Sequence, residues 1–164
     1  MSMVVKKSET VNLISLLKDK GIVLELEGDC KKKILAELAA IAGQSSKMLN
    51  EKGFLKIMIE RESLGSTGIG NGVAIPHAKS KYVKDFILVF ARKSGGIDFG
   101  ALDGERTYLF FALASPQEKV GMHLKILAEI SHLVKDKFIV DRLRQAKDKK
   151  EILKVIAVFN KKPA

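Results

Sequence analysis

The sequence contains few of the residues that typify secreted or membrane-spanning proteins. It has one cysteine, three prolines and no tryptophan among 164 residues, and the single Cys30 cannot form an internal disulfide. The longest uninterrupted apolar run is 108–114, whereas a membrane-spanning helix needs about 20 apolar residues. Charged and polar residues also interrupt the first twenty positions, so these lack the apolar centre of a signal peptide. The absences predict a cytoplasmic protein without disulfides or membrane insertion.

Acidic residues are too few to balance the basic ones. Lys and Arg number 29 against 19 Asp and Glu, which gives a formal net charge of +10. Only five of the basic residues are arginines, and the lysines are spread along the chain instead of forming a nucleic-acid-binding motif. We interpret the charge as a solvated basic surface that attracts acidic partners or anionic ligands. A basic nucleic-acid-binding module is a remote alternative that rests on charge alone, and no nucleic-acid partner is expected.

The order of predicted elements indicates the fold class. Hydrophobic residues make up 46% and charged residues 29% of the chain, which is ordinary globular usage. We expect one domain over residues 1–164, with 1–10 as a loose N-terminal arm. Helices come first, then several strands, then helices again, which predicts an α/β (α+β) fold with helices covering a small mixed sheet. A doubly wound nucleotide-binding fold would alternate strands and helices more regularly.

Periodicity and capping signals place the individual elements. Asp29 suits the N-cap of the second helix and Gly43 its end. The Ser115-x-x-Glu118 spacing is that of a capping box, so a helix is expected to open there unless Gly121 delays it. The expected helices cover 13–17, 30–42, a segment from about 50, 122–135, 138–146 and 150–159, and the expected strands cover 22–26, 73–75, 86–91 and 108–114.

The segment 65–72, GSTGIGNG, contains four glycines in eight residues, and we expect a loop with unusual backbone angles or close ligand approach. The segment is not a P-loop, because it does not end in Gly-Lys-Ser/Thr. It is not a dinucleotide-binding fingerprint either, because an extended Val-Ala-Ile-Pro follows it instead of a helix. A Gly-x-Ser-x-Gly nucleophile elbow is also absent. The reactive side chain that remains is His77. Pro76 precedes it and restricts the backbone, so the orientation of the histidine ring is fixed.

Each remaining candidate has a structural and a functional interpretation. His77 is either a polar loop residue or a nucleophile or general base beside backbone N–H groups that can hold an anion. His123 lies on the apolar side of its helix, as a core histidine or a site residue, whereas His132 lies on the wet side. The two cannot share a metal ion, and a single cysteine argues against structural zinc, so no metal is expected. Arg61 either faces a helix dipole or binds phosphate near His77.

The segment from Gly65 to Lys79, GSTGIGNGVAIPHAK, resembles the signature of IIA domains of the bacterial sugar phosphotransferase system. The branch is the fructose/mannitol type, which includes the nitrogen-regulatory IIA proteins. Further similarity at Arg61-Glu62, Leu102–Gly104, Met122–Leu124 and 138–152 extends the resemblance over about residues 10–158. The resemblance implies the family's fold, a mixed sheet flanked by helices.

The resemblance also implies a function and a set of site residues. The histidine of the I-P-H element, here His77, accepts a phosphoryl group from HPr and passes it to a IIB component. His123 matches a second family histidine that supports the phosphorylated state, and Arg61 matches the family arginine. The hydroxyls of Ser66 and Thr67 are expected to donate further hydrogen bonds to the phosphoryl group. This makes the protein a phosphotransferase component that needs no cofactor.

Two outputs of such a protein fit the sequence. One is a phosphocarrier for sugar uptake, and the other is a nitrogen-type regulator whose phosphorylation state controls protein partners. The run 65–72 resembles the nitrogen-regulatory branch, whereas Ala78-Lys79-Ser80 resembles the fructose branch. Both outputs therefore stay open at the level of sequence.

Overall fold

The computed structural model describes residues 11–17 and 19–160, so the expected arm at 1–10 lies outside the described residues. None of the helices in these ranges is both long and apolar enough to cross a bilayer. The elements in chain order are α1 Leu13–Leu16, a 3₁₀ turn Asp19–Gly21, β1 Ile22–Val23, α2 Lys31–Ala42, α3 Glu51–Ser63, β2 Gly68–Gly70, β3 Val73–Ala74, β4 His77–Ser80, β5 Ile87–Ile97, β6 Thr107–Pro116, α4 Val120–Val134, α5 Lys137–Gln145 and α6 Lys149–Asn160.

Strand β6 lies at the centre of the six-stranded mixed sheet. The strands follow the order β1-β5-β6-β3-β2, and β4 also pairs with β6. Strands β3 and β4 run along the same side of β6, one after the other, at Leu109–Phe110 and at Leu113–Pro116. Between them lies Pro76, which has no N–H to donate, although its carbonyl accepts from the N–H of Leu113. This interruption sets His77 at the start of β4, not behind the end of a strand.

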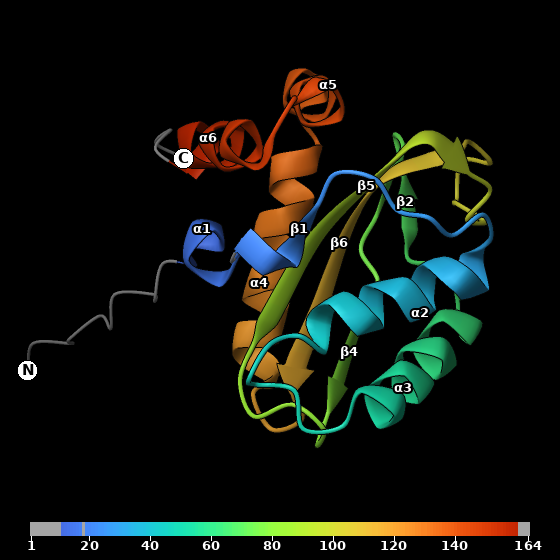
Figure 1. Cartoon of the computed structure of the whole chain (residues 1–164), viewed down its shortest axis with the longest axis vertical. Helices are drawn as coiled ribbons and strands as arrows, with labels where there is room; N and C mark the ends of the chain where they lie inside the picture. Colours follow the sequence, from blue (N-terminus) through green and yellow to red (C-terminus); the bar gives the residue numbers. More distant parts are fainter. Residues whose placement is uncertain (1–10, 18, 161–164) are drawn as a thin grey trace, which may run out of the picture.

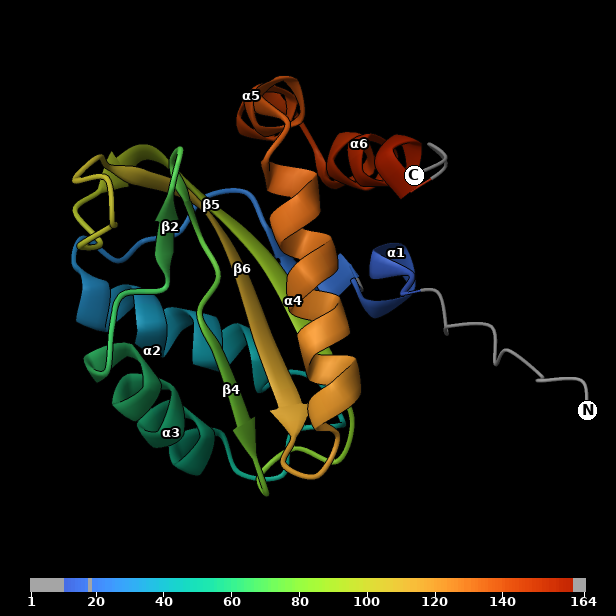
Figure 2. The same cartoon turned by 180° about the vertical axis from the view of Figure 1, so that it is seen from behind.

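Both faces of the sheet are buried, as Figures 1 and 2 show from opposite sides. Helices α2 and α3 cover one face, and α4 covers the other together with α1, α5 and α6. Residues of the two long strands alternate between two hydrophobic clusters, because successive side chains of a strand point to opposite faces. Leu109, Phe111 and Leu113 of β6 pack toward α4, and Phe110, Ala112 and Ala114 pack toward α2 and α3. The predicted fold class is thus confirmed.

The glycine-rich segment folds into a hairpin, not a simple loop. Strands β2 and β3 pair antiparallel, and Gly70, Asn71 and Gly72 have φ of 98°, 56° and 79°. Glycine, and to a lesser degree asparagine, tolerates positive φ. The expectation of unusual backbone angles was correct, whereas the short strand within the segment was not anticipated.

The predicted N-cap of α2 was wrong, and of the two alternatives for the start of α4 the delayed one holds. Cys30, not Asp29, occupies the N-cap of α2, without a capping side-chain bond, and Asp29 pairs with Lys33 on the surface at 3.1 Å. The Ser115-x-x-Glu118 spacing forms no capping box, because β6 runs to Pro116 and α4 begins at Val120. The cross-strand pairing of Ser115 with Lys79 outweighs the local capping signal.

Candidate functional site

His77 is half-buried at the first position of β4, where its ring is bonded to the backbone just before it. The ring nitrogen Nδ1 lies 2.7 Å from the carbonyl oxygen of Ile75. A carbonyl oxygen only accepts hydrogen bonds, so Nδ1 carries the proton. The neutral ring then has its free lone pair on Nε2. One short backbone contact thus fixes both the orientation and the tautomer of the imidazole.

The surroundings keep the His77 ring neutral. Burial lowers the pKa of His77 below its ordinary value, and the positive charges of Arg61 and Lys79 lower it further. The hydrogen bond to Ile75 and the carboxylate of Glu62 act in the opposite direction without reversing the outcome. Since only the unprotonated nitrogen is nucleophilic, the lowered pKa favours the reactive form at neutral pH.

His123 lies next to His77, on the first turn of α4. The two ring centroids are 5.5 Å apart and the ring planes are inclined by 51°. His123 is 3% exposed, and its Nδ1 lies 2.7 Å from the Oγ of Ser115. Burial lowers its pKa to about 4, with contributions from His77 and Lys79. The structure therefore brings together the two histidines that the sequence singled out.

Arg61 lies in the last turn of α3, where the chain enters the glycine-rich hairpin. Its Nη1 donates to the carbonyl oxygen of Gly65 at 3.0 Å, and its charge acts on His77. The residue thus satisfies a carbonyl beyond the helix end and also contributes positive field at His77. The helix-end interpretation therefore holds, whereas phosphate binding by Arg61 stays a prediction.

Glu62 is the site residue that sequence reasoning did not assign a role. The carboxylate is buried, accepts from the N–H of Thr67 at 2.9 Å and from its hydroxyl at 2.6 Å, and pairs with Lys31 at 2.6 Å. It thereby ties α2, α3 and the hairpin together. Its spacing of four from Met58 and eight from Phe54, both buried, could have indicated a buried carboxylate that needs partners.

The hydroxyls of Ser66 and Thr67 already have protein partners. Ser66 donates to the carbonyl oxygen of Phe99 at 3.3 Å and accepts from the N–H of Gly68 at 3.0 Å. Thr67 donates its only hydroxyl proton to Glu62. Direct donation by either hydroxyl to a phosphoryl group would require these bonds to break, and their predicted role stays a prediction.

The other candidates from the sequence lie apart from this pair. His132 is exposed and its ring contacts Phe159, with centroids 5.2 Å apart. Cys30 is exposed at the start of α2. Within 11–17 and 19–160, no group of three or more His, Cys, Asp or Glu side chains is arranged to hold a metal ion.

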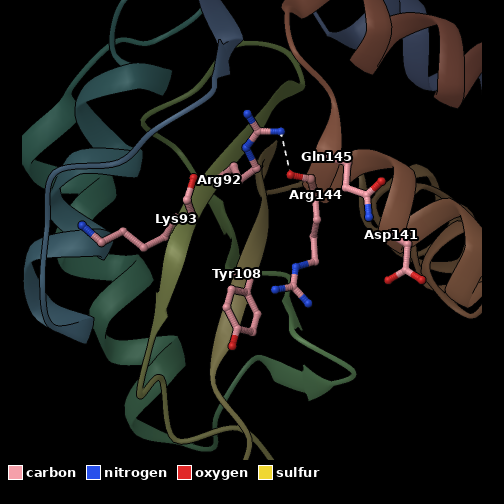
Figure 3. Close-up of a pocket in the computed structure, with 7 residues that line it drawn as sticks. Arg92, Lys93, Tyr108, Asp141, Arg144 and Gln145 are labelled. Carbon is pink, nitrogen blue, oxygen red and sulfur yellow. Dashed lines mark hydrogen bonds between the residues drawn. The ribbon is translucent and has the colours of Figure 1, made fainter.

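A cationic cavity of about 290 Å³ lies where α5 meets the sheet (Figure 3). Its central side chain is the buried Arg92 of β5. Arg92 Nη1 donates to the carbonyl oxygens of Leu143, Arg144 and Ala146 at the end of α5, at 2.8–3.1 Å. Arg144 lies over the ring of Tyr108, 3.7 Å from the centroid. Because these carbonyl oxygens accept hydrogen bonds from Arg92, we interpret Arg92 as a structural residue that holds the end of α5 against the sheet.

Comparisons with known proteins identify the family of the chain. Residues 15–158 match the model of the family described as phosphoenolpyruvate-dependent sugar phosphotransferase system, EIIA 2. A nitrogen regulatory protein of Bradyrhizobium diazoefficiens is 36% identical over 146 residues, covering 89% of this chain and 95% of that protein. A fructose-like EIIA component of Escherichia coli is 36% identical over 124 residues, covering 76% of this chain and 84% of that protein.

The fold comparison leads to the same family. The crystal structure of the nitrogen regulatory protein IIA-Ntr from Neisseria meningitidis superimposes with a TM-score of 0.82 at 31% identity, covering 88% of this chain and 98% of that one. The family model spans nearly all of the described residues, including every residue discussed around His77. The chain therefore belongs to the EIIA 2 family of the phosphoenolpyruvate-dependent sugar phosphotransferase system.

Proposed function

We propose that the protein is a histidine phosphocarrier that accepts a phosphoryl group on Nε2 of His77. The observation that carries this proposal is the 2.7 Å contact between His77 Nδ1 and the carbonyl oxygen of Ile75. It holds the proton on Nδ1 and leaves Nε2 as the nucleophile, so the ring is prepared before a donor arrives.

The transfer moves a phosphoryl group between two imidazole rings. The bond that forms joins His77 Nε2 to phosphorus, and the bond that breaks joins phosphorus to a ring nitrogen of the donor histidine. The electron pair of the broken bond returns to the donor ring, and no proton needs to move. The proton of His77 stays on Nδ1 and is donated as a hydrogen bond to the Ile75 carbonyl oxygen. This bond stabilises the positive charge that the ring gains on phosphorylation.

Nearby donors and charges can stabilise the phosphoryl group. Arg61 and Lys79 act electrostatically on His77, and phosphoryl transfer depends mainly on positioning and on stabilising the oxygens. His123 is close enough for its ring to meet a group on His77, at 5.5 Å between centroids. We therefore assign charge stabilisation to Arg61 and a hydrogen bond to His123.

Exposed apolar side chains near these residues support docking of a partner protein. Leu64 is 85% exposed and Leu102 is 78% exposed, and the N–H of Leu102 donates to Gly68 of the hairpin. Val120 and Leu124 are also exposed, on the same turns of α4 as His123. Such residues suit transient contacts, which we assign to an HPr-type donor and to a IIB component or a regulated protein.

The regulatory output is the second candidate, and the nitrogen-regulatory relatives favour it. In that case phosphorylation adds negative charge at His77, beside His123, and the change alters binding of a protein target. The chemistry at His77 is the same in both cases. The nucleic-acid-binding alternative has no support beyond the net charge.

The decisive experiment is phosphorylation in vitro, followed by intact mass. The wild-type protein is mixed with phosphoenolpyruvate, enzyme I and HPr, beside His77→Ala and the matched control His132→Ala. We expect one acid-labile phosphate on the wild type and on His132→Ala, and none on His77→Ala. Coupling between ³¹P and ¹⁵N in histidine-labelled protein should assign the phosphate to Nε2. Charged HPr that leaves the wild type unmodified would contradict the proposal.

Arg61→Ala tests the assigned charge stabilisation. We expect transfer to slow on the order of 100-fold, as for loss of one preorganised donor, with little change in melting temperature. A lowered melting temperature with an unchanged rate would instead make Arg61 a helix-end residue only.

A further inference from the structure

Ser115 is a buried serine whose side chain, among the described residues, bonds to one partner, a histidine of the site. It lies near the end of β6, is 0% exposed, and its Oγ lies 2.7 Å from Nδ1 of His123. Within the described part of the chain, this hydroxyl makes no other hydrogen bond. The capping role that the sequence predicted is unfilled, so the hydroxyl is available to His123.

We propose that Ser115 is a positioning residue that holds neutral His123 in the tautomer with its proton on Nε2, so that His123 presents an N–H to the phosphoryl group on His77. The inference rests on the proposed function. It adds a residue that acts through His123 and does not itself touch the phosphoryl group.

The direction of the Ser115–His123 hydrogen bond follows from the proton of the hydroxyl. If His123 donated from Nδ1, the Ser115 proton would need another acceptor at a fully buried position, and the described residues offer none. If Ser115 donates, its one proton and the Nδ1 lone pair satisfy each other. A buried donor without an acceptor costs more than a hydroxyl lone pair without a donor, because a hydroxyl has two lone pairs and one proton.

The tautomer of His123 decides what it can offer to an anion. A neutral imidazole has one N–H, and the pKa of about 4 keeps His123 neutral at physiological pH. With Nδ1 engaged by Ser115, that N–H is on Nε2, the only other ring nitrogen. The opposite tautomer would present a lone pair to the phosphoryl oxygens and repel them.

The sheet register places Ser115 on the face of the sheet that α4 covers, one strand away from β4, which carries His77. In the parallel pairing of β4 and β6, His77 lies opposite Leu113 and Lys79 opposite Ser115. Leu113 faces the α4 side of the sheet, and Ser115, two residues further, shares that face. The adjacent strands β4 and β6 thus carry His77 and Ser115, and His123 of α4 contacts both side chains.

The test uses ¹⁵N-histidine NMR on the unphosphorylated full-length protein. We expect His123 in the wild type to show a protonated Nε2 and a bare Nδ1, and His77 the reverse. Ser115→Ala should remove the single tautomer of His123, and Ser115→Thr, which keeps the hydroxyl, should restore it. Ser80→Ala is the matched control, because Ser80 is also buried but its Oγ accepts from the N–H of Tyr82.

Transfer rates from charged HPr complete the test. We expect Ser115→Ala to slow phosphorylation of His77 on the order of 10- to 100-fold, Ser115→Thr to recover most of the rate, and Ser80→Ala to stay near the wild type. A protonated Nδ1 on wild-type His123 would overturn the inference, as would an unchanged tautomer and rate in Ser115→Ala. Absence of any phosphate on the wild type would instead reject the phosphocarrier function itself, whatever the tautomers.

Discussion

The ammonium of Lys31 lies 2.6 Å from the carboxylate of Glu62, so the start of α2 is tied to the end of α3. The same carboxylate holds the N–H and the hydroxyl of Thr67. One buried acid therefore fixes the position from which the glycine-rich hairpin departs. Because this hairpin precedes His77, the contact links helix packing to the placement of the phosphate acceptor.

Replacement of Glu62 should destabilise the protein markedly. In Glu62→Ala, both Thr67 donors lose their acceptor in a buried position and Lys31 loses its counter-charge, so the free energy of unfolding should fall by about 2–4 kcal/mol. Glu62→Gln keeps an oxygen for one donor and should lose less. Urea denaturation measures both. The exposed pair Asp29–Lys33 is the control, and Lys33→Ala should leave stability unchanged. Equal effects of Lys33→Ala and Glu62→Ala would refute this account.

Gly68 and Gly65 should respond differently to alanine. A Cβ on Gly68 would lie 2.9 Å from the Cα of Ala101, a backbone atom that cannot turn away, whereas a Cβ on Gly65 meets nothing within 4 Å. We expect Gly68→Ala to lower the free energy of unfolding by about 1–3 kcal/mol and to slow phosphorylation of His77. Gly65→Ala should change stability by less than about 0.5 kcal/mol. Thermal denaturation compares the two, and equal melting temperatures would contradict the crowding at Ala101.

Two arginines that line the cavity of Figure 3 should differ in importance. Arg92 is buried and donates to carbonyl oxygens of Leu24 and of the end of α5. Arg92→Met leaves these acceptors unpaired, and the free energy of unfolding should fall by about 2–4 kcal/mol. Arg144→Ala removes an exposed contact with Tyr108 and should cost about 1 kcal/mol or less. A larger loss in Arg144→Ala, measured by urea denaturation, would show that α5 is held otherwise.

Stability should fall as the pH drops from about 6.5 toward 4. The pKa of His123 is about 4 in the folded protein against an ordinary 6.5, so in this range the unfolded chain binds a proton that the folded protein does not. Acid therefore favours unfolding, by about 3 kcal/mol for His123 over the whole range. The lowered pKa of His77 acts in the same direction.

Urea denaturation at several pH values between 7 and 4.5 measures this loss. The variant His123→Asn should show a much shallower slope, with the remainder due to His77. A stability that stays flat from pH 7 to pH 5 in the wild type would rule out a buried neutral His123.

Most helices and the two long strands could be predicted because their signals are local. Asn50 accepts from Gly53 at the start of α3, and Gly43 follows the end of α2. The uninterrupted apolar run 108–114 reflects the two buried faces of β6. Strand β5 nevertheless runs through Gly95 and Gly96 to Ile97, past the predicted end, because pairing of Ile97 with Thr107 resumes beyond an irregularity.

The residues of the site also divide into those that the sequence could predict and those that it could not. His77, His123 and Arg61 could be named from residue type and from the family signature. The acceptor at Ile75 and the role of Glu62 could not, because a hydrogen bond to a carbonyl and a buried ion pair depend on backbone geometry and burial. Ser115 illustrates the difference between local and tertiary signals. Its local sequence pattern predicts a helix cap, whereas in the folded protein Ser115 belongs to the sheet and bonds to His123.

The amino-acid sequence by itself determined the family, the order of the helices and of the two long strands, and the histidine expected to carry the phosphoryl group, because these follow from motifs and periodicities of neighbouring residues. The short strands β2 and β4 were not among them. Only the tertiary structure decided which nitrogen of His77 is free, which partner orients His123, and which acid anchors the hairpin. The Ser115–His123 contact joins β6 to α4, and the Lys31–Glu62 ion pair joins α2 to α3. The His77–Ile75 contact joins near neighbours in the chain, but it depends on the backbone path between β3 and β4. These geometries are set only when the sheet and its two helical layers pack together.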